Sequence, residues 1–224
     1  MKIGTFGLLG AAALASAASA AFTGWSSEVI NLGNGHYIMN VYANFNDTGD
    51  RLLNCVNANI STNAAGGFYQ SASNPFWAPG GTQNKSTSDD SWVTIDTNPN
   101  GNGNAFGGTS GDPNFVNFND SSGTTTYDFS YIESAGTGAG WFNGNPSNTY
   151  GFADGGKVLA AHFVCGNVTA DTSVAWNVTC IVKLSNGQTV TGQGTGANTF
   201  FFIPGPGALA LVGAAGLASR RRRA

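Results

Sequence analysis

The chain has 224 residues, 33 of them glycine, and only 9% of its residues are charged, with a formal net charge of −3. Good helix formers such as Glu, Lys and Arg are scarce while turn-forming, β-branched and aromatic residues are common, which argues against a helical domain. Outside the two ends, four basic residues stand against twelve acidic ones, a net charge of −8. This acidic balance excludes a nucleic-acid-binding or anionic-lipid-binding surface.

The first twenty residues have the pattern of a secretory signal peptide. Lys2 supplies a positive charge, Ile3–Ala15 is an apolar stretch, and Ala18-Ser19-Ala20 is a small-residue cleavage site. We therefore expect residues 1–20 to be removed after export through the secretion translocon. The chain from there to Ile203 is long enough for one domain with a single hydrophobic core.

Short segments of alternating hydrophobicity, separated by Gly, Asn and Asp, follow the signal peptide. In His36–Phe45 the apolar residues occupy alternate positions, and Arg51–Ile60 follows after the turn signal of residues 46–50, which predicts a hairpin. Within the second of these strands, one face is expected to be apolar and to contain Leu52, Val56, Ala58 and Ile60.

Further strands are expected at Gly67–Ser71, Ser91–Asp96, Phe115–Phe118, Thr125–Glu133, Lys157–Cys165, Ser173–Leu184, Gln188–Gln193 and Asn198–Ile203. The last four predict a β-meander with a hairpin turn at Ser185-Asn186-Gly187. Residues 72–90, 97–111 and 136–156 are expected to be loops, the last with an apolar island at Gly140-Trp141-Phe142. Roughly nine to eleven strands at this spacing predict an all-β domain over residues 21–203, an antiparallel β-sandwich that is jelly-roll-like or Ig-like.

Three cysteines lie in this region, and an exported protein can form disulfides. Alternation places Cys165 and Cys180 on the inward faces of what we expect to be adjacent strands, which predicts a Cys165–Cys180 disulfide. Cys55 falls on the same alternate positions as the polar residues of its segment, so we expect it on the polar face of the strand and without a disulfide partner. Three reduced cysteines are the alternative.

Asp96, Asn98 and Asn100, followed by Gly101, match the first half of a calcium-binding loop. The twelfth position of that loop is Gly107, where a bidentate acid is needed. We therefore expect no cofactor, and calcium at these residues is the alternative.

Catalytic patterns are absent from the sequence. The only histidines, His36 and His162, lie in expected strands, there is no His-Glu-x-x-His motif, and the only glutamates are Glu28 and Glu133. We therefore expect that the protein is not an enzyme, and hydrolase activity is the remaining alternative.

Trp77 and Trp141 lie in expected loops, where exposed aromatic rings can stack on sugars, so a carbohydrate-binding module is an alternative function. The competing interpretation is that these rings cap the ends of the sandwich.

The C-terminal tail has three parts in a fixed order. Pro204-Gly205-Pro206 breaks regular pairing, Ala208–Ala218 is an uncharged apolar run, and the arginines Arg220, Arg221, Arg222 and Arg223 close the chain. About 12 helical residues span roughly 18 Å, short of a hydrocarbon core of about 30 Å. The arginines are expected to stay on the cytoplasmic side, with the rest of the protein outside. An ordinary membrane anchor is the competing interpretation.

This tail resembles the PEP-CTERM sorting signal of bacterial surface proteins, with Pro-Gly-Pro in place of Pro-Glu-Pro. The resemblance covers Ile203 to Arg223. It implies export, transient membrane tethering by residues 204–224, and cleavage or transfer by an exosortase-type membrane protease. It also implies an envelope or matrix location, so we expect an exported surface protein of structural or adhesive type, with exopolysaccharide as a partner in the carbohydrate-binding alternative.

Overall fold

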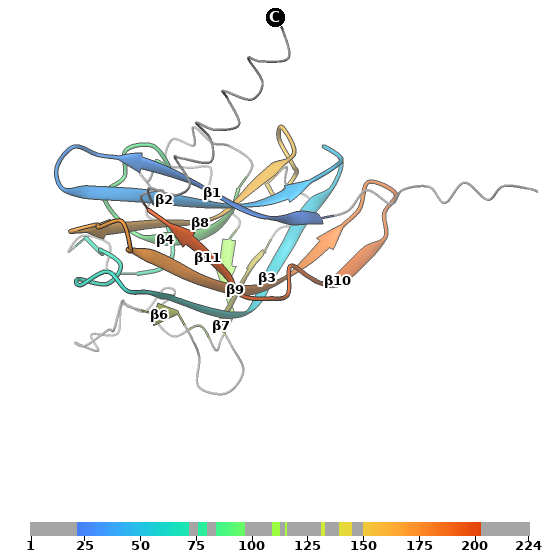
Figure 1. Ribbon diagram of the computed structural model, residues 1–224. Helices are drawn as coiled ribbons and strands as arrows, with labels where there is room; N and C mark the ends of the chain where they lie inside the picture. The colour runs from blue at the N-terminus through green and yellow to red at the C-terminus, as the bar shows by residue number, and fades with distance from the viewer. Residues whose placement is uncertain are drawn as a thin grey trace, which may run out of the picture.

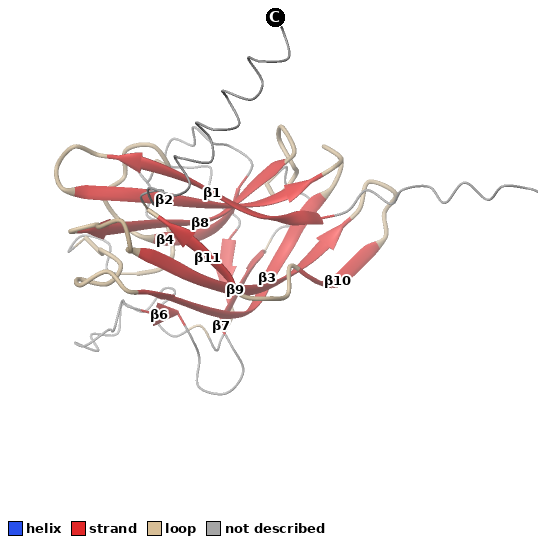
Figure 2. Ribbon diagram, in the orientation of Figure 1, coloured by secondary structure: helices blue, strands red, loops and turns tan. Residues whose placement is uncertain are grey.

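The computed structural model describes residues 22–71, 76–79, 84–96, 109–112, 115, 131–132, 139–144 and 150–202. These residues form strands and loops without a helix (Figure 2), so no helix in this part of the chain has the length and hydropathy to cross a membrane. The strands form two antiparallel sheets around a shared core, which confirms the expected all-β, sandwich-like fold. The signal peptide and the tail lie outside the described residues.

One sheet, here called the β2 sheet, has the order β1-β2-β8-β4 among the described strands (Figure 1). Its strands are β1 (Phe22–Asn31), β2 (His36–Phe45), β8 (Lys157–Gly166) and β4 (Trp92–Asp96). Three of them lie where alternation predicted strands. β1 was not expected, and it pairs with β2 along nearly its whole length.

The other sheet, here called the β9 sheet, has the order β10-β9-β3-β7-β5, with β11 also pairing with β9 and β6 with β3. Its strands are β10 (Thr189–Gln193), β9 (Ser173–Lys183), β3 (Arg51–Thr62), β7 (Ala139–Asn143), β5 (Thr109–Gly111), β11 (Asn198–Phe201) and β6 (Tyr131–Ile132). The expected loops at β7 and β5 are wrong. At Gly140 a Cβ would lie 3.1 Å from the Cys55 carbonyl oxygen, so this glycine lets β7 approach β3 closely.

The turn at residues 46–50 carries the chain from one sheet to the other. The predicted hairpin between β2 and β3 is therefore wrong, because the two strands belong to different sheets. Side chains of the turn bind the β9–β10 turn instead: Ser185 N donates to Asp50 Oδ1 at 2.9 Å, and Ser185 Oγ donates to Asp47 Oδ2 at 3.0 Å. These two bonds fix the turn against the β9 sheet.

The predicted β-meander is correct only in part. β8 and β9 belong to different sheets, whereas β9 and β10 form the expected hairpin. At its turn Gly187 has a φ of 89° and its N–H donates to the Leu184 carbonyl at 2.8 Å. Glycine adopts this left-handed conformation without the steric cost of a Cβ.

Two β-bulges interrupt the alternation of β3 against β9. The register shifts between Leu52 and Asn54 and again between Val56 and Asn59. The buried residues of the strand are therefore Leu52, Cys55, Ala58 and Ile60. The sequence prediction placed Val56 inward and Cys55 on the polar face, and both placements are wrong, because each bulge inserts a residue that changes which face the next side chain occupies.

Aromatic side chains fill the space between the sheets, and Trp176 on β9 lies at their centre. Its ring centroid is 5.0 Å from that of Trp25 on β1, 6.2 Å from Trp141 on β7 and 6.2 Å from Phe163 on β8. Edge contacts at these distances stabilise a core beyond the burial of apolar area alone. Figure 1 shows β1 and β2 on one side of this core and β9 and β3 on the other.

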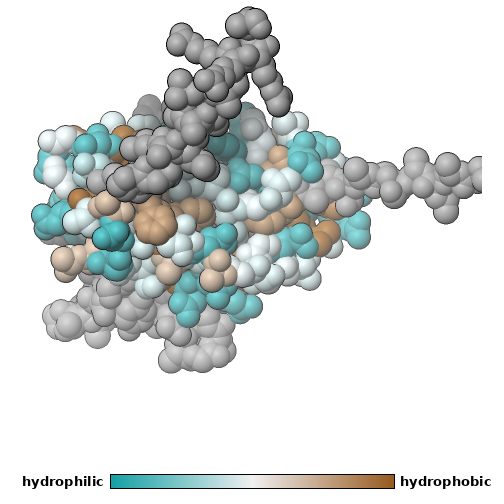
Figure 3. Space-filling view, in the orientation of Figure 1, coloured by the Kyte–Doolittle hydropathy of each residue, from teal (hydrophilic) through white to brown (hydrophobic). Residues whose placement is uncertain are grey.

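The face of the molecule shown in Figure 3 is mixed in polarity where its residues are described. In Figure 3 the apolar areas are scattered among hydrophilic and intermediate ones. Among the described residues, the exposed large apolar side chains are Tyr69 and Phe201, at 39% and 50% exposure. Most large apolar side chains of the described body therefore contribute to the core.

We predict that Trp176→Ala lowers the free energy of unfolding by about 3–5 kcal/mol, because it removes the ring that touches three other strands. Urea unfolding followed by circular dichroism measures the change. The control is Phe201→Ala, whose side chain is half exposed and should cost about 0.5 kcal/mol or less. Equal losses in the two variants would contradict the central place of Trp176.

Candidate functional site

Two rows of side chains cross the face of the β2 sheet that points away from the shared core, here called the outer face. The pairing register places Asn40, His162 and Trp92 in one row across β2, β8 and β4. It places Tyr42, Leu159 and Asp96 in the next row. All six side chains are buried, although they lie outside the core between the sheets. Other parts of the chain must therefore cover this face.

Residues 84–91 form part of that cover, and hydrogen bonds from the outer face hold them in place. Asn40 Nδ2 donates to the Lys85 carbonyl at 3.0 Å, and Val164 N donates to Ser91 Oγ at 2.9 Å. Ser91 N in turn donates to the Tyr69 carbonyl at 3.0 Å. This segment brings Lys85 over the second row.

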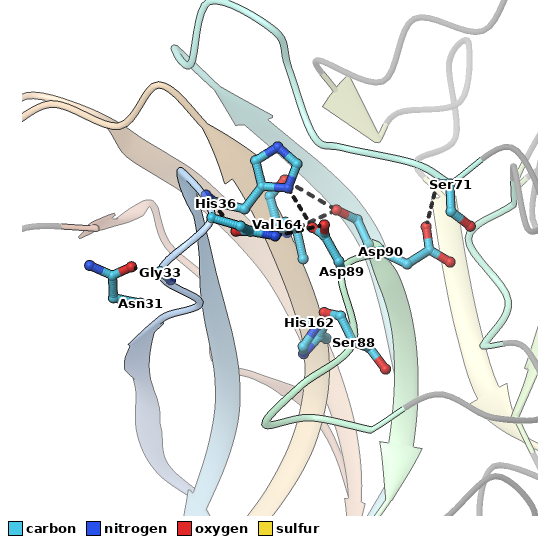
Figure 4. A network of polar contacts seen from close by, with 11 residues as sticks. Asn31, Gly33, His36, Ser71, Ser88, Asp89, Asp90, His162 and Val164 are labelled. Atoms are coloured by element: carbon cyan, nitrogen blue, oxygen red, sulfur yellow. Dashed lines mark hydrogen bonds and ion pairs between the residues drawn. The ribbon is translucent and has the colours of Figure 1, made fainter.

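A polar network fixes the same segment at its other end (Figure 4). His36 at the start of β2 lies 2.5 Å from Asp89, measured between Nδ1 and Oδ1, and Asn34 Nδ2 donates to the second Asp89 oxygen at 3.2 Å. Ser71 N donates to Asp90 Oδ1 at 2.9 Å. The β1–β2 turn and the segment after Phe68 are thereby joined to residues 84–91.

His162 is the titratable member of the first row and, like Asn40 and Trp92, is fully buried. Its ring stacks on Trp92 with the centroids 4.4 Å apart and the planes 4° from parallel. Nδ1 lies 2.7 Å from Asn40 Oδ1, and Nε2 lies 3.0 Å from the Ser88 carbonyl oxygen. Two oxygen acceptors favour the charged ring, but burial is the larger effect and lowers the pKa of His162 to about 3. The ring is therefore neutral near pH 7.

A cavity of about 170 Å³ opens beside the second row. Its lining consists of three acidic residues, two lysines, a tyrosine and a leucine from five separate stretches of the chain: Glu28, Tyr42, Lys85, Asp96, Asp154, Lys157 and Leu159. It is smaller than the roughly 300–1,000 Å³ of a typical pocket for a drug-sized ligand. Its size suits a small polar group or one ring of a larger molecule.

Tyr42 lies between opposite charges in this cavity. Its hydroxyl donates to Glu28 Oε2 at 2.9 Å and accepts from Lys85 Nζ at 3.3 Å. The ammonium nitrogens of Lys85 and Lys157 lie 5.6 Å and 5.4 Å from the ring centroid. Burial first, and then the hydrogen bond and charge of Glu28, raise the pKa of Tyr42 well above its usual value. The phenol therefore stays protonated and orients Glu28 and Lys85.

The lining supplies both acceptors and donors at the mouth of the cavity. Three of the lining residues are exposed, namely Glu28, Asp154 and Lys157. The floor of the cavity is buried and consists of Tyr42, Asp96 and Leu159. Carboxylates accept hydrogen bonds and ammonium groups donate them, so this arrangement can hold a ligand rich in hydroxyl groups.

The two tryptophans of the carbohydrate-binding alternative are buried. Trp77 is 2% exposed and packs against Phe68 and Phe163, while Trp141 is 0% exposed and its Nε1 donates to the Thr94 carbonyl at 3.0 Å. Neither ring offers a face to a ligand. The prediction that Trp77 and Trp141 stack on carbohydrate is wrong, because both rings fill the core between the sheets.

The predicted Cys165–Cys180 disulfide is not formed. All three cysteines are free thiols, and Cys165 lies on β8 in the β2 sheet while Cys180 lies on β9 in the other sheet. Thr62 Oγ1 lies 3.8 Å from the Cys165 sulfur. The prediction failed because it assumed that β8 and β9 are neighbours.

Of the three residues named for the calcium alternative, the structure describes only Asp96. Asp96 ends β4 and is buried, whereas Asn98 and Asn100 lie outside the described residues. In the part of the chain that the structure describes, no group of three or more His, Cys, Asp or Glu side chains is placed to hold a metal ion. The sorting residues Pro204, Gly205, Pro206 and Arg220 to Arg223 also lie outside the described residues.

The cavity was not found from the sequence, because its residues are far apart along the chain. One signal was available: Lys85 and Lys157 are two of only four basic residues between the terminal signals, and both line this cavity. In a body with so few charges, this convergence makes the cavity the candidate site. No protein-family model, curated protein or solved structure matches the chain.

We predict that acid destabilises the protein through His162. The unfolded ring titrates near pH 6.5 and the buried ring near pH 3, so between these values the unfolded state binds the additional proton. Stability should fall as the pH drops from 6.5 to 3, by roughly 3–5 kcal/mol from this group. Urea midpoints at pH 7 and pH 4 measure it, and His162→Gln should remove this part of the loss. An unchanged pH dependence in that variant would contradict the prediction.

Proposed function

We propose that the protein is an exported bacterial surface or extracellular-matrix protein of structural or adhesive type. The order of breaker, apolar segment and arginine cluster between Ile203 and Arg223 carries this proposal. The signal-peptide pattern of residues 1–20 supports it from the other end. A body whose described residues form two packed sheets around a shared core suits a protein that must persist outside the cell.

In this proposal the secretion translocon exports the chain, and an exosortase-type membrane protease reads the tail. Residues 204–224 tether the precursor transiently to the membrane, and residues 21–203 remain at the surface as one domain. For its finer class we propose a jelly-roll-like or Ig-like sandwich, supported by the antiparallel pairing of every described strand.

A second candidate function is the binding of exopolysaccharide through the cavity of the β2 sheet. The observation that favours it is the set of exposed donors and acceptors at the mouth of the cavity, beside the ordered Glu28–Tyr42–Lys85 contacts. Tyr42 is 6% exposed and offers no open ring face. Recognition would therefore depend on hydrogen bonds to sugar hydroxyls rather than on stacking.

We predict that the mature protein recovered from the cell surface lacks both terminal segments. Intact mass measures both cleavages in one experiment. Replacing Arg220 to Arg223 together by serine should prevent processing of the tail, because the positive stop that orients the apolar segment is lost. The control Gly205→Glu restores an acid between the prolines and should still be processed. Recovery of wild-type protein that ends at Ala224 would overturn the sorting proposal.

For the second candidate, we predict that Lys157→Ala weakens binding of exopolysaccharide fragments about tenfold or more, through loss of one charge-assisted hydrogen bond. Lys183→Ala is the matched control, since Lys183 is also an exposed strand lysine but does not line the cavity. Calorimetric titration with fragments from the producing cells compares the two. Equal affinity in both variants would place the contact elsewhere, and the absence of binding by the wild type would leave the structural role.

A further inference from the structure

Cys55 and Cys180 face each other across two neighbouring strands. They are direct partners in the antiparallel register of β3 and β9. Both side chains are 0% exposed and belong to the same core between the sheets. The two thiols therefore lie on the same face of one sheet at the same position along the strands.

The spacing of such partners suits a disulfide. Directly opposite residues in an antiparallel pair have Cα atoms about 4.5–5.5 Å apart. Disulfides join Cα atoms that are usually about 4.4–6.8 Å apart. The two sulfurs can therefore be joined by rotation of the cysteine side chains alone, and the pairing of the strands need not change. The Cys180 thiol also raises the pKa of Cys55, in addition to the larger effect of burial, which agrees with two neighbouring thiols on one face of the sheet.

The bulges of β3 create this pair. Register shifts lie on both sides of Cys55, between Leu52 and Asn54 and between Val56 and Asn59. Asn57, within the second bulge, has a φ of 52°, a left-handed conformation that asparagine adopts more readily than most residues. Without the first bulge, strict alternation from Leu52 would turn Cys55 to the opposite face.

Cys165 has no comparable partner among the described cysteines. It lies on β8, opposite Tyr37 of β2, in the other sheet. Its neighbour is the Thr62 hydroxyl. Pairing of Cys165 with either of the other cysteines would have to cross the core between the sheets.

We propose that Cys55 and Cys180 form a cross-strand disulfide when the chain folds in contact with a disulfide oxidant, and that Cys165 remains a thiol. The oxidant is a disulfide such as oxidised glutathione or an exported dithiol oxidase. One cysteine thiolate attacks it and releases its first thiol; the second cysteine then attacks the mixed disulfide and releases its second thiol. Two protein thiols lose two electrons and two protons, and one oxidant disulfide becomes two thiols.

Oxidation must occur before the sheets close. Burial raises the pKa of Cys180 to about 12 and that of Cys55 well above its usual value, so the folded protein contains almost no reactive thiolate. The link would then close a long loop that includes β4, β7 and β8. Only the natural supply of oxidant rests on the proposed export; the geometry of the pair does not.

The test uses the full chain, reduced, unfolded in guanidinium and refolded in a buffer of oxidised and reduced glutathione. Free thiols are then alkylated under denaturing conditions and the peptides are mapped by mass spectrometry. We expect the Cys55 and Cys180 peptides to be linked and Cys165 to be alkylated. Alkylation of all three cysteines, or a link that includes Cys165, would overturn the proposal.

Single serine variants separate the pair from the third cysteine. Cys165→Ser should keep the link, whereas Cys55→Ser and Cys180→Ser should lose it and leave the remaining cysteines alkylated. Reduction should lower the melting temperature of the wild type and of Cys165→Ser by roughly 5–15 °C. A link formed on refolding but absent from chains recovered from cells would support the pair and count against the proposed export.

Discussion

The contact between the two sheets around Trp176 is the constraint on which the rest of the structure depends. Its ring meets Trp25 and Phe163 from the β2 sheet and Trp141 from its own sheet, so four strands must hold their registers for these contacts to form. Connecting segments also contribute to this contact, because Phe68 and Trp77, which lie outside the strands, pack on Phe163. Chain segments with loop-like sequences therefore contribute to the core.

Local alternation predicted most of the longer strands, including β2, β3, β8 and β9. In β9 every second residue from Val174 to Val182 is buried, as the sequence indicated. In β3 the same argument failed, because two bulges turn Cys55, rather than Val56, toward the inner face. No residue type in a sequence identifies a bulge unambiguously. Assignment of strands to sheets also failed, because strand pairing joins residues far apart in the sequence. The turn after β2, for example, contacts Ser185 through Asp47 and Asp50, more than a hundred residues away.

The candidate site was less predictable than the fold for a related reason. Its floor is a row across β2, β8 and β4, and such a row exists only after the strands have paired in their registers. The sequence indicated instead the tryptophans flanked by glycine and proline. Trp77 and Trp141 satisfy the hydrophobic requirement of the core, which is a stronger demand on a large apolar ring than the loop character of its neighbours.

The two faces of the β2 sheet consequently perform separable tasks. Its inner face contributes aliphatic and aromatic groups to the core, where the loss of one ring affects stability first. Its outer face contains the neutral His162, the oriented Tyr42 and the exposed charges at the mouth of the cavity. Lys157 can be changed there without removing a core contact, because its residue is exposed. A loss of ligand binding in such a variant would therefore report on recognition, whereas the same loss after substitution of Phe163 on the inner face would report on folding.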